Sequence, residues 1–165
     1  MRVLPGSGLV SPGVQPYVRN VNGAVVLFDG VCNLCNGAVQ FVLDHERSRP
    51  GAESVRFAAL QSEAAQGVLA QVVGPEQARA LREGQHGAPD SIVVVEGGKV
   101  HTSSDAALRL ARHLRAPWRW LGVLWVVPRP LRDLVYRWIA RNRYRWFGKD
   151  DTCRVPTPEL RARFL

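Results

Sequence analysis

Apolar residues in the first part of the chain switch between two periods. Ala24–Phe28 is apolar at every position, which is typical of a strand buried on both faces of a sheet. Asn33 to about Glu46 has apolar residues at helical spacing. Ser54–Ala58 alternates, which indicates a second strand. Glu63–Val73 is again helical until Gly74-Pro75 stops it.

The next segments complete an α/β pattern. Glu76–Glu83 predicts a short helix, and Ile92–Val95 and Lys99–Thr102 predict strands joined as a hairpin by Gly97-Gly98. A further helix begins at residue 103 or 104, where a serine can cap it, and runs to about residue 114. The resulting order, β-α-β-α-β-β-α, is that of the thioredoxin-like fold. We expect the first two strands to be parallel through a right-handed crossover and the last two to be antiparallel.

The pattern changes after Pro117. Residues 118–127 form a short apolar helix candidate, which two prolines end. Residues 131–147 are amphipathic, with one apolar and one basic stripe at helical spacing. The apolar stripe contains Leu131, Leu134, Val135, Trp138 and Ile139, and the basic stripe contains Arg137, Arg141 and Arg145.

Charge and aromatic content divide the chain in the same place. The formal net charge is +8; residues 1–116 hold 11 basic and 10 acidic side chains, whereas residues 117–165 hold 11 and 4. The tryptophans are Trp118, Trp120, Trp125, Trp138 and Trp146. We therefore expect a flexible lead (1–21), a thioredoxin-like redox domain (22–116) and a helical basic, aromatic extension (117–165) packed on it.

The extension has three open interpretations. It packs its tryptophan and leucine stripe on the body and displays its arginines to water, it lies on an anionic membrane surface, or it contacts nucleic acid. No nucleic-acid motif supports the last interpretation, which ranks lowest.

Cys32 and Cys35 form a C-x-x-C pair between the first predicted strand and helix. A thiol at a helix N-terminus meets unpaired backbone N–H groups, which favour the reactive thiolate. The pair therefore predicts thiol–disulfide exchange. The alternative is a zinc half-site, which needs two more ligands; Cys153 and four isolated histidines are the candidates, and there is no second C-x-x-C. Cys153 itself is by default a spectator, with a third redox thiol or a partner-linking thiol as alternatives.

The cysteine count and the lengths of the apolar runs indicate a cellular compartment. Three cysteines are too few for a disulfide scaffold, so the pair indicates a reducing environment. The N-terminus lacks the apolar core of a secretion signal, and the apolar runs are far shorter than the roughly 20 residues that cross a bilayer. We expect a cytoplasmic protein, peripheral to a membrane if the extension binds one.

Four stretches of this sequence resemble the DCC family of thiol–disulfide oxidoreductases, named for D-x-x-C-x-x-C. They are V-V-L-F-D-G-V-C-N-L-C-N-G-A-V-Q-F at 25–41, P-D-S-I-V-V-V at 89–95, the segment 104–106, and R-N-R-Y-R-W-F-G at 141–148. The resemblance covers about residues 22–165, and it implies a thioredoxin-like fold and a redox activity without supplying a substrate.

Roles for the site residues follow from their positions. Cys32 is the expected nucleophile and the more exposed thiol, and Cys35 is the shielded thiol that resolves the mixed disulfide. Asn33, Leu34 and Pro89 are the expected substrate-binding residues. In thioredoxin-like folds a cis proline before the third strand faces the C-x-x-C pair; the alternative for Pro89 is a trans proline that begins a strand.

Asp29 has two equally weighted interpretations. A carboxylate near the pair can accept the proton of Cys35 as that thiol attacks. It would also raise thiol pKa values. Alternatively, Asp29 only binds N–H groups of the loop.

The sequence thus predicts a thiol–disulfide oxidoreductase with no bound cofactor beyond the Cys32–Cys35 disulfide. Its expected partners are a disulfide-containing protein or small thiol and an unspecified electron donor. The alternative is a non-catalytic module that binds metal or a membrane surface.

Overall fold

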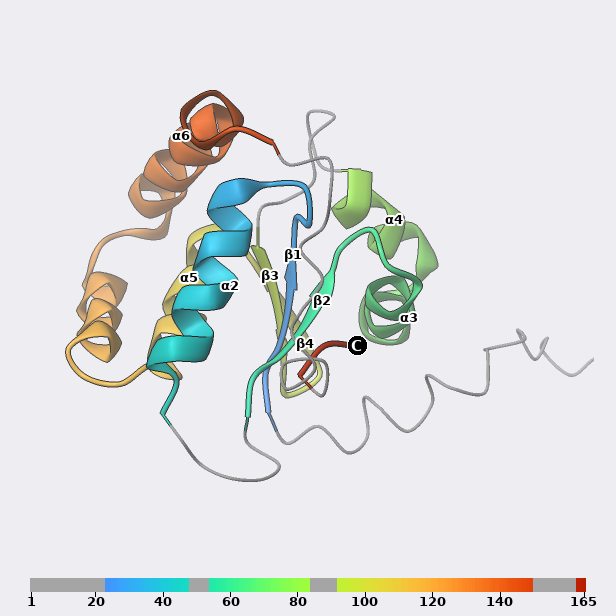
Figure 1. The fold of residues 1–165 in the computed structure, drawn as a ribbon, viewed down its shortest axis with the longest axis horizontal. Helices are drawn as coiled ribbons and strands as arrows, with labels where there is room; N and C mark the ends of the chain where they lie inside the picture. The colour runs from blue at the N-terminus through green and yellow to red at the C-terminus, as the bar shows by residue number, and fades with distance from the viewer. Residues whose placement is uncertain (1–22, 48–53, 84–91, 150–162) are drawn as a thin grey trace, which may run out of the picture.

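A four-stranded sheet forms the centre of the computed structural model, which describes residues 23–47, 54–83, 92–149 and 163–165 (Figure 1). The strands are β1 (Val25–Phe28), β2 (Arg56–Ala59), β3 (Ile92–Glu96) and β4 (Lys99–Thr102), in the order β2-β1-β3-β4. β1 and β2 are parallel, whereas β1 and β3, and β3 and β4, are antiparallel. This confirms the predicted order and the thioredoxin-like fold.

Helices cover both faces of the sheet. They are α2 (Asn33–His45), α3 (Glu63–Val73), α4 (Pro75–Glu83), α5 (Ser103–Arg112), the 3₁₀ helix η1 (Trp118–Val126) and α6 (Arg129–Phe147). α2 and α5 lie on one face and α3 and α4 on the other, while η1 and α6 form an outer layer over α2 and α5 (Figure 1). The predicted segments match these elements to within a few residues.

Alternation along the strands divides the core between the two faces. Val26 and Phe28 of β1 face α2 and α5, where they pack with Val39 and Leu110. Val25 and Leu27 contribute to the second cluster, under α3 and α4, with Leu69 among its buried members. Because both faces of β1 are covered, the strand is apolar throughout.

α6 has its apolar stripe turned away from the body, contrary to the interpretation in which that stripe packs on it. Leu134 is 60% exposed and Trp138 59% exposed, whereas Arg143 is 2% exposed. The reason is that α6 contacts the body through polar groups, which need partners when they are buried.

The contacts between α5 and α6 illustrate this polar attachment. Asp133 of α6 accepts hydrogen bonds from the backbone N–H and the hydroxyl of Ser104, at the N-terminal end of α5. The expected serine cap is therefore wrong: the N-cap residue of α5 is Thr102, and the carboxylate of Asp133 accepts the hydrogen bond from the helix N-terminus instead. Arg129 and Arg132 of α6 pair with Asp105 of α5, at 3.2 and 3.3 Å.

Candidate redox-active site

The two cysteines lie where the sequence predicts them, at the start of α2. Cys32 is the N-cap residue, with φ −93° and ψ 118°, and its carbonyl accepts the first helical hydrogen bond from Asn36 N at 2.9 Å. Its own N–H donates to Asp29 O at 3.2 Å, which closes the turn after β1. Cys35 lies one turn into α2, and no disulfide joins the two cysteines.

Both thiols are buried, which corrects the expectation that Cys32 is exposed. Cys32 is 0% and Cys35 2% exposed. The chain that leaves α6 covers them: Cys32 pairs with Lys149 in an isolated antiparallel bridge, and Asn33 Nδ2 donates to Phe147 O at 3.0 Å. The residues of the strand-to-helix turn alone do not indicate that a segment more than a hundred residues later packs over Cys32.

Gly148 allows this cover to form. It ends α6 with φ 76°, a left-handed conformation that favours glycine, and its N–H donates to Tyr144 O at 3.0 Å. The chain thereby turns from the helix axis toward Cys32. The ammonium of Lys149 lies 4.2 Å from the centre of the Tyr144 ring, which holds the segment against α6.

The two thiols have opposite tendencies to ionise. The hydrogen bond from the Cys35 thiol is the largest influence on Cys32 and lowers its pKa to about 6; the Arg143 guanidinium lowers it further, while burial and Asp29 oppose both. The same hydrogen bond, followed by burial, raises the pKa of Cys35 far above its ordinary value. Near neutral pH the pair therefore favours a Cys32 thiolate that accepts a hydrogen bond from a Cys35 thiol.

Asp29 is fully buried and accepts four hydrogen bonds. Its Oδ1 accepts from Gln61 Nε2 at 2.9 Å and from Val31 N at 3.3 Å. Its Oδ2 accepts from Arg143 Nη2 at 3.1 Å and from the Tyr144 hydroxyl. Asp29 thus binds a loop N–H, as one interpretation expects, and also joins β1, the segment after β2, and α6.

Arg143 and Tyr144 are the residues of this site that sequence reasoning missed. Arg143 forms a buried ion pair with Asp29 and donates to the Tyr144 hydroxyl at 3.0 Å. Burial and the hydrogen bond to Asp29 raise the pKa of Tyr144 to about 12, so its hydroxyl stays protonated and acts as a donor. Both lie in the stretch 141–148 that resembles the DCC family, and this resemblance is the sequence feature that could have indicated them as site residues.

The remaining expected residues are placed as follows. Asn33 donates to the covering segment, and Leu34 is half-buried and packs against the core cluster beneath α2. Pro89 and Cys153 lie outside the described residues, so their predicted roles stay predictions. Within the described residues no three histidine, cysteine, aspartate or glutamate side chains gather as a metal site.

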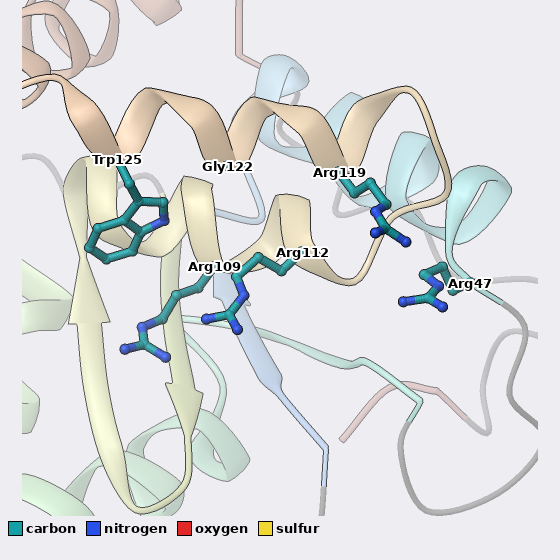
Figure 2. A pocket seen from close by; sticks show the side chains of 6 residues that line it. All are labelled: Arg47, Arg109, Arg112, Arg119, Gly122 and Trp125. Carbon is teal, nitrogen blue, oxygen red and sulfur yellow. The ribbon is translucent and has the colours of Figure 1, made fainter.

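A cavity of about 600 Å³ lies well away from the thiols, between α5 and η1 (Figure 2). It is lined by Arg47, Arg109, Arg112, Arg119, Gly122 and Trp125. Arg47 follows the C-terminal end of α2, whose other end carries the thiols, and a helix of 13 residues is roughly 20 Å long. The cavity is therefore separate from the candidate redox site.

A C-x-x-C pair at the first helix of a thioredoxin-like sheet is the arrangement of thiol–disulfide exchange proteins. The chain belongs to the family described as DCC1-like thiol-disulfide oxidoreductase, whose model matches residues 26–149.

Two relatives support this assignment. The uncharacterized protein YuxK of Bacillus subtilis is 46% identical over 147 residues, which cover 89% of this chain and 97% of YuxK. The DCC family protein At1g52590 of Arabidopsis thaliana, named as chloroplastic, is 42% identical over 135 residues, or 79% of this chain and 69% of that protein. No solved structure matches the chain.

Proposed function

We propose that this protein exchanges thiols and disulfides through Cys32 and Cys35, acting on a disulfide-containing protein or small molecule. The observation that carries the proposal is the asymmetric thiol pair at the N-terminus of α2. The pKa of Cys32 is lowered to about 6 and that of Cys35 is raised, which separates an attacking thiolate from a resolving thiol.

The proposed reaction has two exchange steps. The Cys32 thiolate attacks a substrate disulfide, forms a mixed disulfide and releases the first substrate thiolate, which takes up a proton. Cys35 then loses its proton and attacks the Cys32 sulfur, which releases the second substrate thiol. The substrate gains two electrons, and the protein ends with a Cys32–Cys35 disulfide. An external dithiol donor would return two electrons and two protons.

Asp29 and Arg143 act on the second step in this proposal. Cys35 holds its proton tightly as long as the Cys32 thiolate accepts its hydrogen bond; formation of the mixed disulfide removes that thiolate and its charge. Arg143 lowers the pKa of Cys35, whereas Asp29 raises it. We propose that Asp29 takes the proton of Cys35, with the guanidinium of Arg143 holding the carboxylate in place.

Access to the thiols requires the covering segment to move. Cys32 is fully buried, and its backbone pairs with Lys149. Asn33 holds the same segment through one hydrogen bond to Phe147 O. We propose that substrates enter when residues 147–149 swing away from the N-terminus of α2, a local opening that breaks few contacts. The expected substrate contacts of Asn33 and Leu34 belong to this open state, while that of Pro89 stays a prediction from the sequence.

A redox titration of the full chain, with metal analysis of the same sample, tests the proposal. We expect a reversible two-electron couple that is lost in both Cys32→Ser and Cys35→Ser. About one equivalent of tightly bound zinc, lost in Cys32→Ser and accompanied by no reversible couple, would favour the non-catalytic metal-binding alternative instead.

A further inference from the structure

We propose that the outer layer formed by η1 and α6 is a docking surface for an anionic membrane. The first observation is exposure: apolar side chains of both helices face solvent, and Val126 is 84% exposed. The extension surface comprises Trp120, Val123, Val126, Leu131, Leu134, Val135, Trp138, Ile139 and Trp146. This many exposed apolar side chains on two consecutive helices are typical of an interaction site rather than of an ordinary water-facing surface.

The orientation of α6 strengthens this inference. A surface helix ordinarily buries its apolar stripe against the core and exposes its charged side chains. In α6, Arg132, Asp133 and Arg143 face the body and find partners there, whereas Leu134 and Trp138 face outward. The ion pairs hold the helix in this orientation, so the apolar stripe is presented outward by the fold.

Charge identifies the occupant as anionic. Residues 115–149 contain Asp133 as their single acidic residue, and it is turned toward Ser104. The basic residues of the same segment are Arg115, Arg119, Arg129, Arg132, Arg137, Arg141, Arg143, Arg145 and Lys149. Arg137, Arg141 and Arg145 are exposed beside the apolar stripe. The arginine-lined cavity adds to this positive field, because Arg119 of η1 lies above Arg112 of α5 (Figure 2).

The combination of tryptophan, aliphatic residues and arginine fits the interface of a bilayer. Tryptophan places an apolar ring and an N–H donor at the headgroup level, and arginine attracts anionic lipids. No helix among the described residues is both long enough and apolar enough to span a bilayer, so the contact would be peripheral.

A second copy of this chain fits the surface less well. A symmetric dimer places the same patch of both copies face to face. Arg137 and Arg141 of each copy would then approach basic groups of the other with no exposed acid in the segment to meet them. An anionic bilayer instead supplies the complementary charge.

Vesicle binding of the reduced full-length protein tests the proposal, independently of any thiol activity. The probes are vesicles of phosphatidylcholine alone and of phosphatidylcholine with 30% phosphatidylserine. All five tryptophans of the chain lie in η1 and α6, and three of them, Trp120, Trp138 and Trp146, belong to this surface, so tryptophan fluorescence reports on it. We expect a blue shift with the anionic vesicles only, lost steeply as salt rises from 0.05 to 0.5 M.

Two variants define the surface. Arg137→Glu with Arg141→Glu should weaken binding at least about 25-fold, because each basic residue near an anionic surface contributes about fivefold. The matched control, Arg79→Glu with Arg82→Glu on α4, makes the same change in net charge on the opposite side of the sheet and should bind more tightly than that variant. Leu134→Ser with Trp138→Ala should also lose binding while the melting temperature falls only slightly, since both side chains are more than half exposed and the lost ring contact is that of Trp138 with Trp146.

Three results would overturn the proposal. Absence of binding at low salt is the first. The second is equal weakening by the α4 and α6 charge reversals, since net charge alone would then explain the attraction. The third is a dimer in solution that Trp138→Ala dissociates without any effect on vesicles, which would assign the surface to self-association.

Discussion

The buried ion pair between Asp29 and Arg143 gives the sharpest prediction about this structure. Arg143→Met removes the guanidinium but keeps much of its volume. It leaves the fully buried Asp29 without its counter-charge. Breaking a buried pair in this way costs about 3–5 kcal/mol, against a total stability of about 5–15 kcal/mol for a domain. We expect the free energy of unfolding in urea to fall by that amount.

The same variant should change thiol chemistry. Arg143 lowers the pKa of Cys32, although less than the hydrogen bond from Cys35 does. In Arg143→Met the pKa of Cys32 should therefore rise and yet remain below its ordinary value. The pH dependence of alkylation by iodoacetamide, measured in a Cys153→Ser background, reports this shift.

Arg132→Met provides the matched control. Arg132 is also on α6 and pairs with Asp105, at 3.3 Å, far along the helix from the thiols. It should destabilise the protein and leave the pKa of Cys32 unchanged. Asp29→Asn combined with Arg143→Met should recover part of the lost stability, because no buried charge remains. The reasoning is refuted if Arg143→Met costs less than about 1 kcal/mol and leaves the Cys32 profile where it was.

Three further outcomes are expected. The unfolding free energy of the reduced protein should rise between about pH 6 and 9, by up to about 4 kcal/mol. The reason is that the lowered pKa of Cys32 in the folded state makes the unfolded chain bind more protons in that range. Above pH 9 the raised pKa of Cys35 should reverse the slope. The oxidised protein, which lacks both thiols, should not show this dependence in parallel urea titrations. Asp29→Asn should slow resolution of a mixed disulfide in stopped-flow measurements more than it slows the initial attack, and equal effects on both steps would leave Asp29 a structural residue. Asn33→Ala removes the hydrogen bond to Phe147 O and should speed alkylation of Cys32 about 2- to 5-fold at a pH above its pKa, whereas an unchanged rate would mean that the segment 147–149 does not limit access.

The sheet and the position of the thiols could be predicted from local patterns. Continuous apolarity in Val25–Phe28 requires a strand with both faces covered, and a C-x-x-C pair directly after it lies at the next helix N-terminus. These features depend on neighbouring residues, so a single sequence contains them. The parallel pairing of β1 with β2 and the antiparallel pairing of β3 with β4 follow from connection length, whereas the antiparallel pairing of β1 with β3 joins strands that are not consecutive.

The environment of the thiols could not be predicted in the same way. Cys32 pairs with Lys149, and Asp29 forms its ion pair with Arg143, in both cases more than a hundred residues away. Helical periodicity identified the two stripes of α6, but both face solvent. The residues that contact the body, Arg132, Asp133 and Arg143, belong to neither stripe. Burying the apolar stripe is the usual arrangement; the polar partners Ser104 and Asp105 reversed it here.

This reversal also changes why the extension should matter to stability. If the tryptophan and leucine stripe packed on the body, truncation after Pro117 would expose the body surface that these residues cover. In the structure those tryptophans are already exposed, and truncation would instead remove the partners of Asp29 and Ser104. We still expect the truncated chain to melt earlier, now because a buried carboxylate and a helix N-terminus lose their partners.

Trapping of the mixed disulfide tests the central claim most directly. In a Cys153→Ser background, the full-length protein is incubated with oxidised glutathione at pH 7 and examined by intact mass and peptide mapping. Cys35→Ser should accumulate one glutathione on Cys32, Cys32→Ser should accumulate essentially none, and the protein with both cysteines should proceed to the Cys32–Cys35 disulfide. Equal adducts at both positions, or none in Cys35→Ser, would contradict the assignment of Cys32 as the attacking thiolate.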